Sequence, residues 1–265
     1  MPDILFWNIQ RLGGGRLSHG AEELKEDLEG LTSKCDPDII VLCEGLRGLR
    51  KTMRRNHELP TGYVAPKFIK NHGNYRNHNT LRYVLMHKSH LNCQAYLIDC
   101  GGSRPALAIC FNGTCVIALH APSITNMTSR QTGQMCEAYD TVFNLIGNNQ
   151  LVGAQQIALI FGDLNMDLRT AGIARRFNRN RQGRNIEQFG ILDPGAGTHR
   201  NSRTRRYDTT LDWAITAPGV HATIEVVVPD PPKELEWGSD DSDDEYMPSY
   251  QNSKEPDHRP ILITW

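Results

Sequence analysis

The sequence predicts a layered α/β protein, and three observations carry this prediction. Short apolar runs recur along the chain and stop at a glycine or a polar residue, which is typical of buried strands. Two longer stretches place their apolar residues at helical spacing. The chain of 265 residues is 39% hydrophobic, which is enough to form the core of a layered domain of this length.

The individual elements follow from these patterns. Residues 18–31 carry leucines at helical spacing and predict a helix capped at its start by Ser18. The stretch 129–147 predicts a second helix that packs on a sheet. Strands are expected at 4–9, 39–43, 81–87, 91–99, 106–111, 114–119, 157–161, 209–215, 222–228 and 261–265. Strands 81–87 and 91–99 resemble a pair joined by a short turn, and Asn112-Gly113 is a strong hairpin signal.

The stretch IALIFGDLNMDL, residues 157–168, places two polar side chains at the end of a buried strand. Five apolar residues meet Gly162, and Asp163 and Asn165 follow two positions apart. Residues i and i+2 of an extended chain project to the same side, so these two side chains should lie together where the strand leaves the core. Taken alone, the stretch is explained by an ordinary turn, because Gly, Asp and Asn are common turn residues.

Other apolar runs also end on polar groups. Asn8 closes the first run, Glu44 follows the second, and His120 ends the second strand of the predicted hairpin. Antiparallel pairing brings residues 104 and 120 close together, so Arg104 is expected near His120. Each of these residues has an ordinary explanation, as the first exposed residue of a loop or as a partly buried histidine.

Two further sites complete the pattern. Asp212 lies among apolar neighbours and needs a partner, since an unpaired buried charge is costly. Asp257 and His258 stand just before the last strand. Ordinary explanations at every strand end are improbable together. The set supplies what hydrolysis of a phosphate ester needs: carboxylates for a hard divalent cation, a His–Asp pair for a proton, and Arg and Asn for phosphate oxygens.

The net charge of −1 conceals two local excesses of opposite sign. Residues 169–206 hold ten arginines against two acids, a balance of +8, and residues 233–245 hold seven acids against one lysine, a balance of −6. A further basic cluster occupies residues 47–55. The basic blocks suggest a polyanionic partner, and the acidic block suggests a solvated loop or a decoy of like charge.

The cysteines and the apolar runs exclude several classes of protein. The seven cysteines show no CxxC pair and no zinc spacing, which argues against a disulfide framework or structural zinc. Cys35, Cys43, Cys110 and Cys115 are expected to be core thiols, with a Cys100–Cys110 pair as the less favoured alternative. No apolar run approaches the length of a membrane span. The chain enters a strand directly after Met-Pro-Asp, so no secretory signal is expected in it. A mature form without its signal, secreted or delivered to a host, is also compatible, as is a cytoplasmic protein.

Six segments carry a resemblance to a known family. In chain order they read ILFWNIQ, IIVLCEGL, LHAP, ALIFGDLNMD, TLDWAI and EPDHRPI. They resemble the successive motifs of the endonuclease/exonuclease/phosphatase superfamily, which has the DNase I-like fold, and they extend from residue 4 to residue 265. GDxN together with a terminal DHxP is specific as a pair. Within the superfamily, Gln10, SRPALAI and TLDWAI look most similar to the catalytic nuclease subunit of cytolethal distending toxin.

The resemblance implies a more detailed architecture. It implies one domain over residues 1–265, with a basic insertion at 169–206 and an acidic loop at 229–256. The fold would be a four-layer α/β sandwich, in which two packed, mostly antiparallel mixed sheets are flanked by helices. The site would lie at one edge of the sandwich.

The resemblance also implies which residues bind the metal and the phosphate. Glu44 would be the main Mg²⁺ ligand, with Asn8 beside it and Asp257 near the metal, and Mn²⁺ could substitute. Asn165 would hold the scissile phosphate, and Arg104 would contact it.

The implied proton chemistry uses four more side chains. Asp163 would orient or deprotonate the attacking water. Asp212 would pair with His258 and fix its tautomer, while His258 and His120 flank the phosphate as base and acid, in an order that the sequence leaves open.

Two departures from the family pattern qualify these roles. In the DNase branch a carboxylate on the strand near residues 81–86 supports the first histidine, and NTLRYVLM offers none, so His120 is expected to lack that support. Gln10 stands where the base-excision repair branch carries a metal-binding aspartate, which argues against an abasic-site repair enzyme.

Three functions follow as hypotheses. The leading one is a Mg²⁺-dependent DNA endonuclease, acting as a toxin or effector with delivery or binding subunits as partners, because basic clusters suit a phosphate backbone. The second is a phosphatase acting on phosphoinositides or other phosphomonoesters with the same core residues. The third, a binding module without activity, requires a broken set of site residues, whereas this set is complete.

Overall fold

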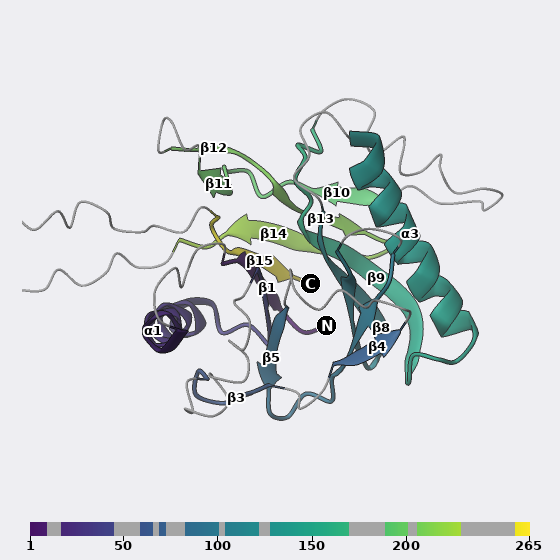
Figure 1. The fold of residues 1–265 in the computed structure, drawn as a ribbon, viewed down its shortest axis with the longest axis horizontal. Coiled ribbons are helices and arrows are strands. Elements are labelled where there is room, and N and C mark those ends of the chain that lie inside the picture. The colour runs from purple at the N-terminus through teal and green to yellow at the C-terminus, as the bar shows by residue number, and fades with distance from the viewer. Residues whose placement is uncertain are drawn as a thin grey trace, which may run out of the picture.

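Two large sheets, a two-stranded sheet and two helices make up the regular structure of the residues that the computed structural model describes (Figure 1). These are residues 1–9, 17–44, 59–65, 69–72, 83–100, 104–121, 128–169, 189–200, 206–228 and 258–265.

The first large sheet, sheet A, is mixed. It contains β1 (Ile4–Asn8), β2 (Ile39–Cys43), β3 (Tyr63–Val64), β5 (Val84–Lys88), β14 (Thr223–Val226) and β15 (Ile261–Thr264) in the order β14-β15-β1-β2-β5-β3. Only β1 and β2 are parallel within it, and the other neighbours are antiparallel.

The second large sheet, sheet B, is also mixed and mostly antiparallel. It contains β4 (Lys70–His72), β6 (Gln94–Ile98), β7 (Ala106–Phe111), β8 (Gly113–His120), β9 (Ala154–Asp163), β10 (Gly190–Leu192) and β13 (Asp212–Thr216) in the order β10-β13-β9-β8-β7-β6-β4. Strands β8 and β9 run parallel, as do β4 and β6. A separate hairpin pairs β11 (His199–Arg200) with β12 (Tyr207–Thr209).

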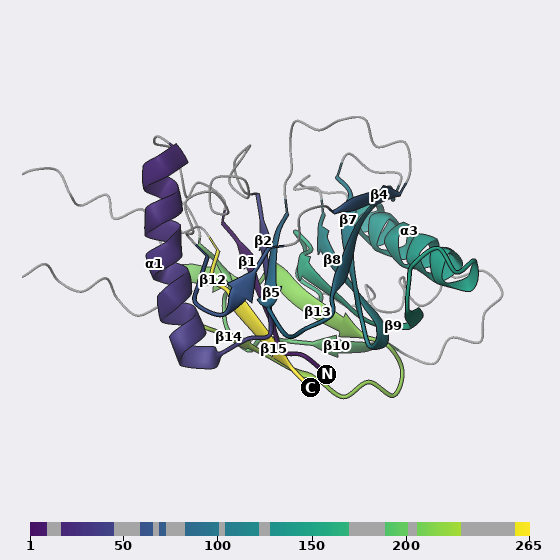
Figure 2. The same ribbon diagram turned by 90° about the horizontal axis from the view of Figure 1, so that it is seen from below.

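The sheets pack face to face and a helix covers each outer face, which gives four layers (Figure 2). Helix α1 (Leu17–Cys35) buries leucines against the outer face of sheet A. Helix α3 (Thr128–Gly147) buries Met135 and Val142 against the outer face of sheet B. The core between the sheets contains Phe6 and Phe161, whose rings meet edge to face at 5.8 Å. Burial of such apolar surface drives the association of the layers.

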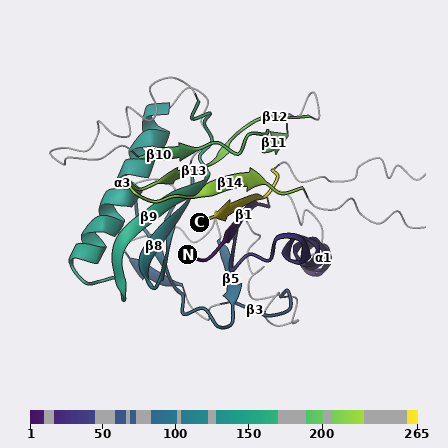
Figure 3. The ribbon, with the colours of Figure 1, turned by 180° about the vertical axis from the view of Figure 1, so that it is seen from behind.

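The two chain ends lie close together on the sheet A side (Figure 3). There the indole N–H of Trp265 donates a hydrogen bond to the carbonyl of Pro2 at 2.8 Å. Neither described helix combines the length and the hydropathy that crossing a membrane requires.

The predicted four-layer sandwich of mixed sheets is confirmed, with local corrections. Helix α1 begins at Leu17, one residue before the predicted start at Ser18. The strands predicted at 81–87 and 91–99 are β5 and β6, which belong to different sheets and do not pair. The strand predicted at 209–215 begins at Asp212. The single-domain interpretation stays a prediction, and the basic insertion and acidic loop fall largely outside the described residues.

The hairpin prediction is confirmed. The cysteine prediction is wrong for Cys110 and Cys115, whereas Cys35 and Cys43 are free thiols. Asn112 (φ 45°) and Gly113 (φ 81°) form the turn between β7 and β8 in the left-handed region that Asn-Gly favours. Cys110 and Cys115 are directly opposed in the register of these strands and form a disulfide, so they are not free thiols. The two cysteines are five residues apart across a tight turn, which makes them neighbours on adjacent strands. Such neighbours are close enough to form a disulfide.

Candidate active site

Strand direction brings the first four site residues to one edge of the sandwich. Asn8 ends β1, and Glu44 follows the parallel strand β2, with Asn8 in register with Cys43. His120 ends β8 directly opposite Asp163, which ends the parallel strand β9. Because parallel strands end at the same edge of a sheet, the polar residue after each strand is delivered to a common place.

Antiparallel strands place their amino-terminal ends at the same edge. Asp212 is the first residue of β13, in register with Asp163 on β9. His258 precedes β15, which runs antiparallel to β1 and therefore starts where β1 ends. Arg104 stands before β7, and its guanidinium hydrogen-bonds to His120 Nε2 from the neighbouring antiparallel strand, as predicted. All the described candidate residues thus converge, although they are spread over the chain.

The Asp163 carboxylate is the centre of this cluster. Its Oδ2 accepts a hydrogen bond from Asn8 Nδ2 at 2.8 Å and lies 3.5 Å from His120 Nε2 and 3.7 Å from His258 Nε2. Its Oδ1 accepts the backbone N–H of Asn165 at 2.9 Å. Asn8 belongs to sheet A and Asp163 to sheet B, so this hydrogen bond joins the two sheets.

The backbone around this centre is held in uncommon conformations. Gly162 has a φ of 133°, and a Cβ there would lie 2.0 Å from the carbonyl oxygen of Leu119, so no other residue fits. Asn165 (φ 51°) and Glu44 (φ 59°) are left-handed although they are not glycines. Such strain persists only where the surrounding structure enforces it, and it clusters at functional sites.

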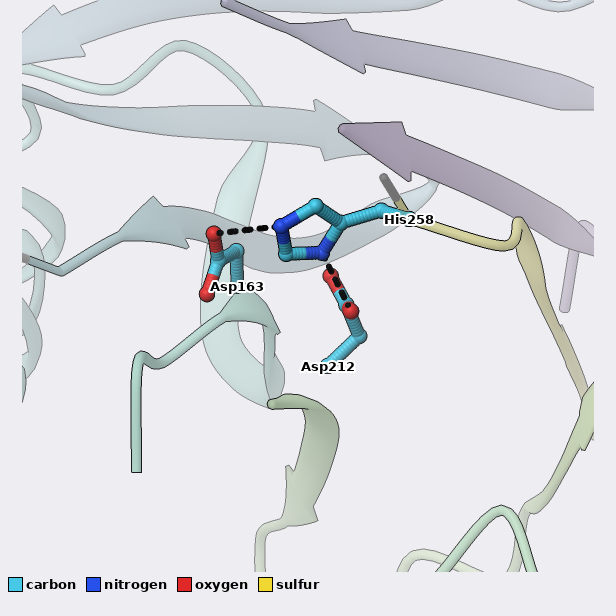
Figure 4. Close-up of side chains that lie close together, drawn as sticks. All are labelled: Asp163, Asp212 and His258. Atoms are coloured by element: carbon cyan, nitrogen blue, oxygen red, sulfur yellow. Dashed lines mark hydrogen bonds and ion pairs between the residues drawn. The ribbon is translucent and has the colours of Figure 1, made fainter. Parts of the chain in front are cut away.

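Asp212 and His258 form a buried pair (Figure 4). Asp212 Oδ2 lies 2.9 Å from His258 Nδ1, which leaves Nε2 of the ring facing Asp163. This is the partner that the sequence required for Asp212. Within the described part of the chain, the other carboxylate oxygen, Asp212 Oδ1, is buried without a hydrogen-bond partner.

Arg104, His120 and Glu44 form the more open side of the cluster. Glu44 Oε1 lies 3.3 Å from His120 Nε2 and 3.8 Å from an Arg104 nitrogen, and its side chain is 15% exposed. The carbonyl of Ala121 accepts hydrogen bonds both from Arg104 (3.0 Å) and from the Asn165 amide (2.8 Å). The two residues expected to contact phosphate are therefore fixed to one backbone oxygen.

The second ring nitrogen of His120, Nδ1, is buried and has no hydrogen-bond partner among the residues that the structure describes. On the segment leading into β5, the Tyr83 hydroxyl oxygen lies 3.2 Å from the carbonyl oxygen of Pro105 and 3.5 Å from that of Ala118. The expected lack of support for His120 stays a prediction, because residues 81 and 82 of that segment lie outside the described residues.

The electrostatic environment gives the two histidines and the Asp163 carboxyl different pKa values. Burial, reinforced by Arg104 and His258, lowers the pKa of His120 well below its usual range, so its ring is neutral at pH 7. Burial also lowers the pKa of His258, but attraction to Asp212 and Asp163 outweighs this and raises it to about 9. Burial raises the pKa of the Asp163 carboxyl to about 7, against the attraction of His258. The site therefore offers a cationic imidazole beside a carboxyl that titrates near neutrality.

The chelated protein is expected to lose stability as the pH rises from 6.5 to about 9. The pKa of His258 is raised from 6.5 to about 9 by folding, so its protonated ring stabilises the fold fully below pH 6.5 and this contribution disappears as the pH passes about 9. We expect the free energy of urea unfolding in EDTA to fall by about 2 kcal/mol over this range. The His258→Gln variant should show a flatter profile, and parallel profiles for the two proteins would contradict this assignment.

The donor set fits a divalent cation in two ways. Asp163, Asp212 and His258 are all buried and offer ligand atoms within 4.8 Å of one another, a group able to hold a divalent metal ion. Glu44 and Asn8 offer hard oxygens on the more open side of the same cluster, which is the ligand type that Mg²⁺ prefers. Asp257, the third expected ligand, lies outside the described residues, as does Gln10.

Three residues near His258 were missed by the sequence analysis. The indole N–H of Trp7 donates to the His258 carbonyl at 2.9 Å. The ring of His199 packs edge-on against the ring of His258, with centroids 4.9 Å apart. Thr198 is fully buried beside Asp212. Trp7 looks like an ordinary core residue in its strand, and nothing in the loop sequence GTHR marks either of the other two.

The fold and the site together define a class of protein. A sandwich of two mixed sheets, with carboxylates, a His–Asp pair, Arg and Asn at one edge, is suited to metal-dependent hydrolysis of phosphate esters. The Endonuclease/Exonuclease/phosphatase family matches residues 5–240. The chain belongs to this family of phosphoester hydrolases. No curated protein sequence matches it.

Solved structures similar to this chain include TDP2 proteins and cytolethal distending toxins. Truncated TDP2 of Caenorhabditis elegans has a TM-score of 0.58 at 14% identity, covering 99% of this chain and 96% of that chain. TDP2 of D. rerio, complexed with single strand DNA product, gives 0.57 at 11%, covering 99% and 98%. The cytolethal distending toxin of Actinobacillus actinomycetemcomitans gives 0.58 at 15%, covering 99% and 97%. These matches show the DNase I-like fold, and they favour neither group.

Proposed function

We propose that the chain is a Mg²⁺-dependent phosphodiesterase that cuts DNA as an endonuclease. The observation that carries the proposal is the convergence of three side chains on the Asp163 carboxylate: the amide of Asn8 and the imidazoles of His120 and His258. A carboxyl that titrates near pH 7 between a neutral and a cationic imidazole is suited to proton transfer at neutral pH.

In this proposal Glu44, Asn8 and Asp257 hold the metal ion. Glu44 is the most open carboxylate of the described cluster, whereas Asp212 is already committed to His258. When bound, a divalent cation stabilises the negative charge that builds up on phosphate oxygens. The ring of His120 lies next to Glu44, and its neutral state avoids placing a second positive charge beside the cation.

The remaining side chains would act directly on the phosphate and the water. Asp163 orients the attacking water and takes its proton. His258 is held in one tautomer by Asp212 and, being cationic, donates a hydrogen bond from Nε2 to the phosphate or to the leaving oxygen. Arg104 and Asn165 bind phosphate oxygens from their common anchor on Ala121. His120 is assigned a positioning role, because its Nδ1 has no support among the described residues.

DNA is the proposed substrate because many arginines follow Asp163 and Asn165 in the sequence. The excess of eight positive charges over residues 169–206 suits a phosphate backbone, where such contacts dominate affinity. A DNA product is bound by the D. rerio TDP2 structure, which has the same fold. A toxin or effector role with delivery subunits is a narrower hypothesis that rests on the motifs of the sequence.

Plasmid cleavage tests the proposed activity. Supercoiled plasmid with Mg²⁺ is expected to be nicked by the protein, and neither the protein in EDTA nor the His258→Ala variant should nick it. Mn²⁺ should restore activity after chelation. Equal nicking by the wild-type protein and His258→Ala would contradict the assignment of nuclease activity to this site. Release of inorganic phosphate from phosphoinositides without any nicking would instead support the phosphomonoester phosphatase.

A further inference from the structure

A residue outside the catalytic cluster contacts the backbone on both sides of the Asp212–His258 pair. Asp212 begins β13, and His258 lies in the segment before β15, so the two side chains come from different sheets. A hydrogen bond between them is kept only if both backbones are held in place. The hairpin of β11 and β12 lies against both segments (Figure 1).

Thr198, directly before β11, is hydrogen-bonded to the backbone of both segments. Its hydroxyl oxygen accepts the backbone N–H of Leu211 at 3.0 Å and that of Asp212 at 3.1 Å. Its carbonyl accepts the N–H of Arg259, the residue after His258, at 2.7 Å. Its own N–H donates to the carbonyl of Thr209 at 3.0 Å. Its side chain is fully buried, so water does not compete for these bonds.

Neighbouring contacts hold the hairpin in the same register. His199 and His258 form an antiparallel bridge, and the two imidazole rings are in contact. The Arg259 guanidinium lies 3.9 Å from the centre of the Tyr207 ring of β12, a cation–π contact. These contacts fix the hairpin against His258, and among the described residues the Thr198 hydroxyl is what ties the hairpin to the backbone N–H of Asp212.

We propose that Thr198 is a positioning residue for the Asp212–His258 pair, acting through the two backbone N–H groups that its hydroxyl receives at the start of β13. A hydroxyl oxygen has two lone pairs, and both are used here. Without the oxygen, two buried N–H donors lose their acceptor, and the start of β13 must shift to find another. Such a shift turns the Asp212 carboxylate away from His258 Nδ1.

Valine and serine separate the effect of the oxygen from that of side-chain bulk. Thr198→Val keeps the shape and removes the oxygen, whereas Thr198→Ser keeps the oxygen and removes a methyl group. Thr216→Val is the matched control, because Thr216 is a buried threonine at the other end of the same strand. If Thr198→Val fails to fold, Thr198→Cys, whose sulfur is a weak acceptor, takes its place against Thr198→Ser.

The first measurement is independent of catalysis. In histidine-labelled, EDTA-treated protein at pH 7, the Nδ1–H proton of His258 should give a low-field NMR resonance, assigned by its absence in His258→Gln. We expect this resonance to be lost or moved upfield in Thr198→Val and kept in Thr198→Ser and Thr216→Val. An unchanged resonance in a folded Thr198→Val protein overturns the proposal, as does its loss in Thr198→Ser.

The second measurement rests on the proposed nuclease activity. Thr198→Val should lower kcat for plasmid nicking by about ten- to a hundredfold with KM within about twofold, because small misplacements of a catalytic group reduce turnover more than binding. Thr198→Ser should restore kcat to within about threefold of wild type. A loss that serine does not restore overturns the positioning role. If the wild-type protein cuts no plasmid, the proposed function fails, and the resonance still decides the role of Thr198.

Discussion

The Asp163→Asn variant is expected to fold normally and to lose at least about a thousandfold in kcat for plasmid cleavage. The substitution keeps the shape of the side chain but removes its ability to accept a proton. It also places an amide where Asn8 Nδ2 donates at 2.8 Å and where the imidazoles of His120 and His258 approach. The loss should appear in kcat, because the carboxylate is assigned to the chemical step and phosphate binding to other residues.

The fold should tolerate this change at neutral pH. Burial raises the pKa of Asp163 to about 7, which means that its charged form is unfavourable in the folded protein. A neutral asparagine avoids this cost, and thermal unfolding should therefore occur close to the wild-type temperature. Asp167→Asn is the matched control, because Asp167 lies in the same loop and pairs with Arg169 at the surface. It should keep activity within about threefold. A folded Asp163→Asn enzyme with near wild-type kcat would remove Asp163 from the chemistry.

Glu44→Gln is expected to have the second largest effect on activity. This effect should appear as a higher Mg²⁺ concentration needed for activity. A neutral amide binds Mg²⁺ more weakly than a carboxylate, so activity at low Mg²⁺ should fall by about a hundredfold or more and recover partly at high Mg²⁺. Calorimetry should show the weakened binding without any substrate. Glu29→Gln, on the exposed face of α1, controls for the loss of one negative charge.

The same pair of measurements distinguishes the two possible metal positions. If Mg²⁺ affinity is unchanged in Glu44→Gln and abolished in Asp212→Asn, the cation is held by Asp163, Asp212 and His258. The opposite pattern supports Glu44 as the principal ligand and leaves Asp212 to orient His258. Both variants replace an acid by its isosteric amide and so remove one negative charge each. A difference in their Mg²⁺ affinity therefore reflects where the metal ion binds and not the loss of charge.

The polar residues at the strand ends were predictable from the sequence because a local pattern marks where each strand ends. A buried apolar run that stops at a carboxylate, an amide or an imidazole shows where a strand ends. The hairpin turn at Asn112-Gly113 predicts that Arg104 lies beside His120, and the two side chains are hydrogen-bonded. The pairing of Asp212 with His258 followed from the cost of an unpaired buried charge.

Other features depend on long-range packing that leaves no local trace. The pattern of β5 and β6 does not reveal that they enter different sheets, because a short turn can connect strands within a sheet or between two sheets. Trp7 resembles any core aromatic until its indole is seen to reach the His258 carbonyl. Thr198 has no sequence signal, since its role comes from a hairpin that folds back on β13.

The hydrogen bond from Asn8 to Asp163 spans the interface between the two sheets, and this placement has a consequence for the whole molecule. Sheet A and the segment leading into it supply Asn8, Glu44 and His258, while sheet B and its flanking residues supply Arg104, His120, Asp163 and Asp212. Neither half carries a complete set of reacting groups. In the proposed mechanism, activity therefore requires the two sheets to be docked in register. Activity should then report this docking more directly than secondary-structure content can.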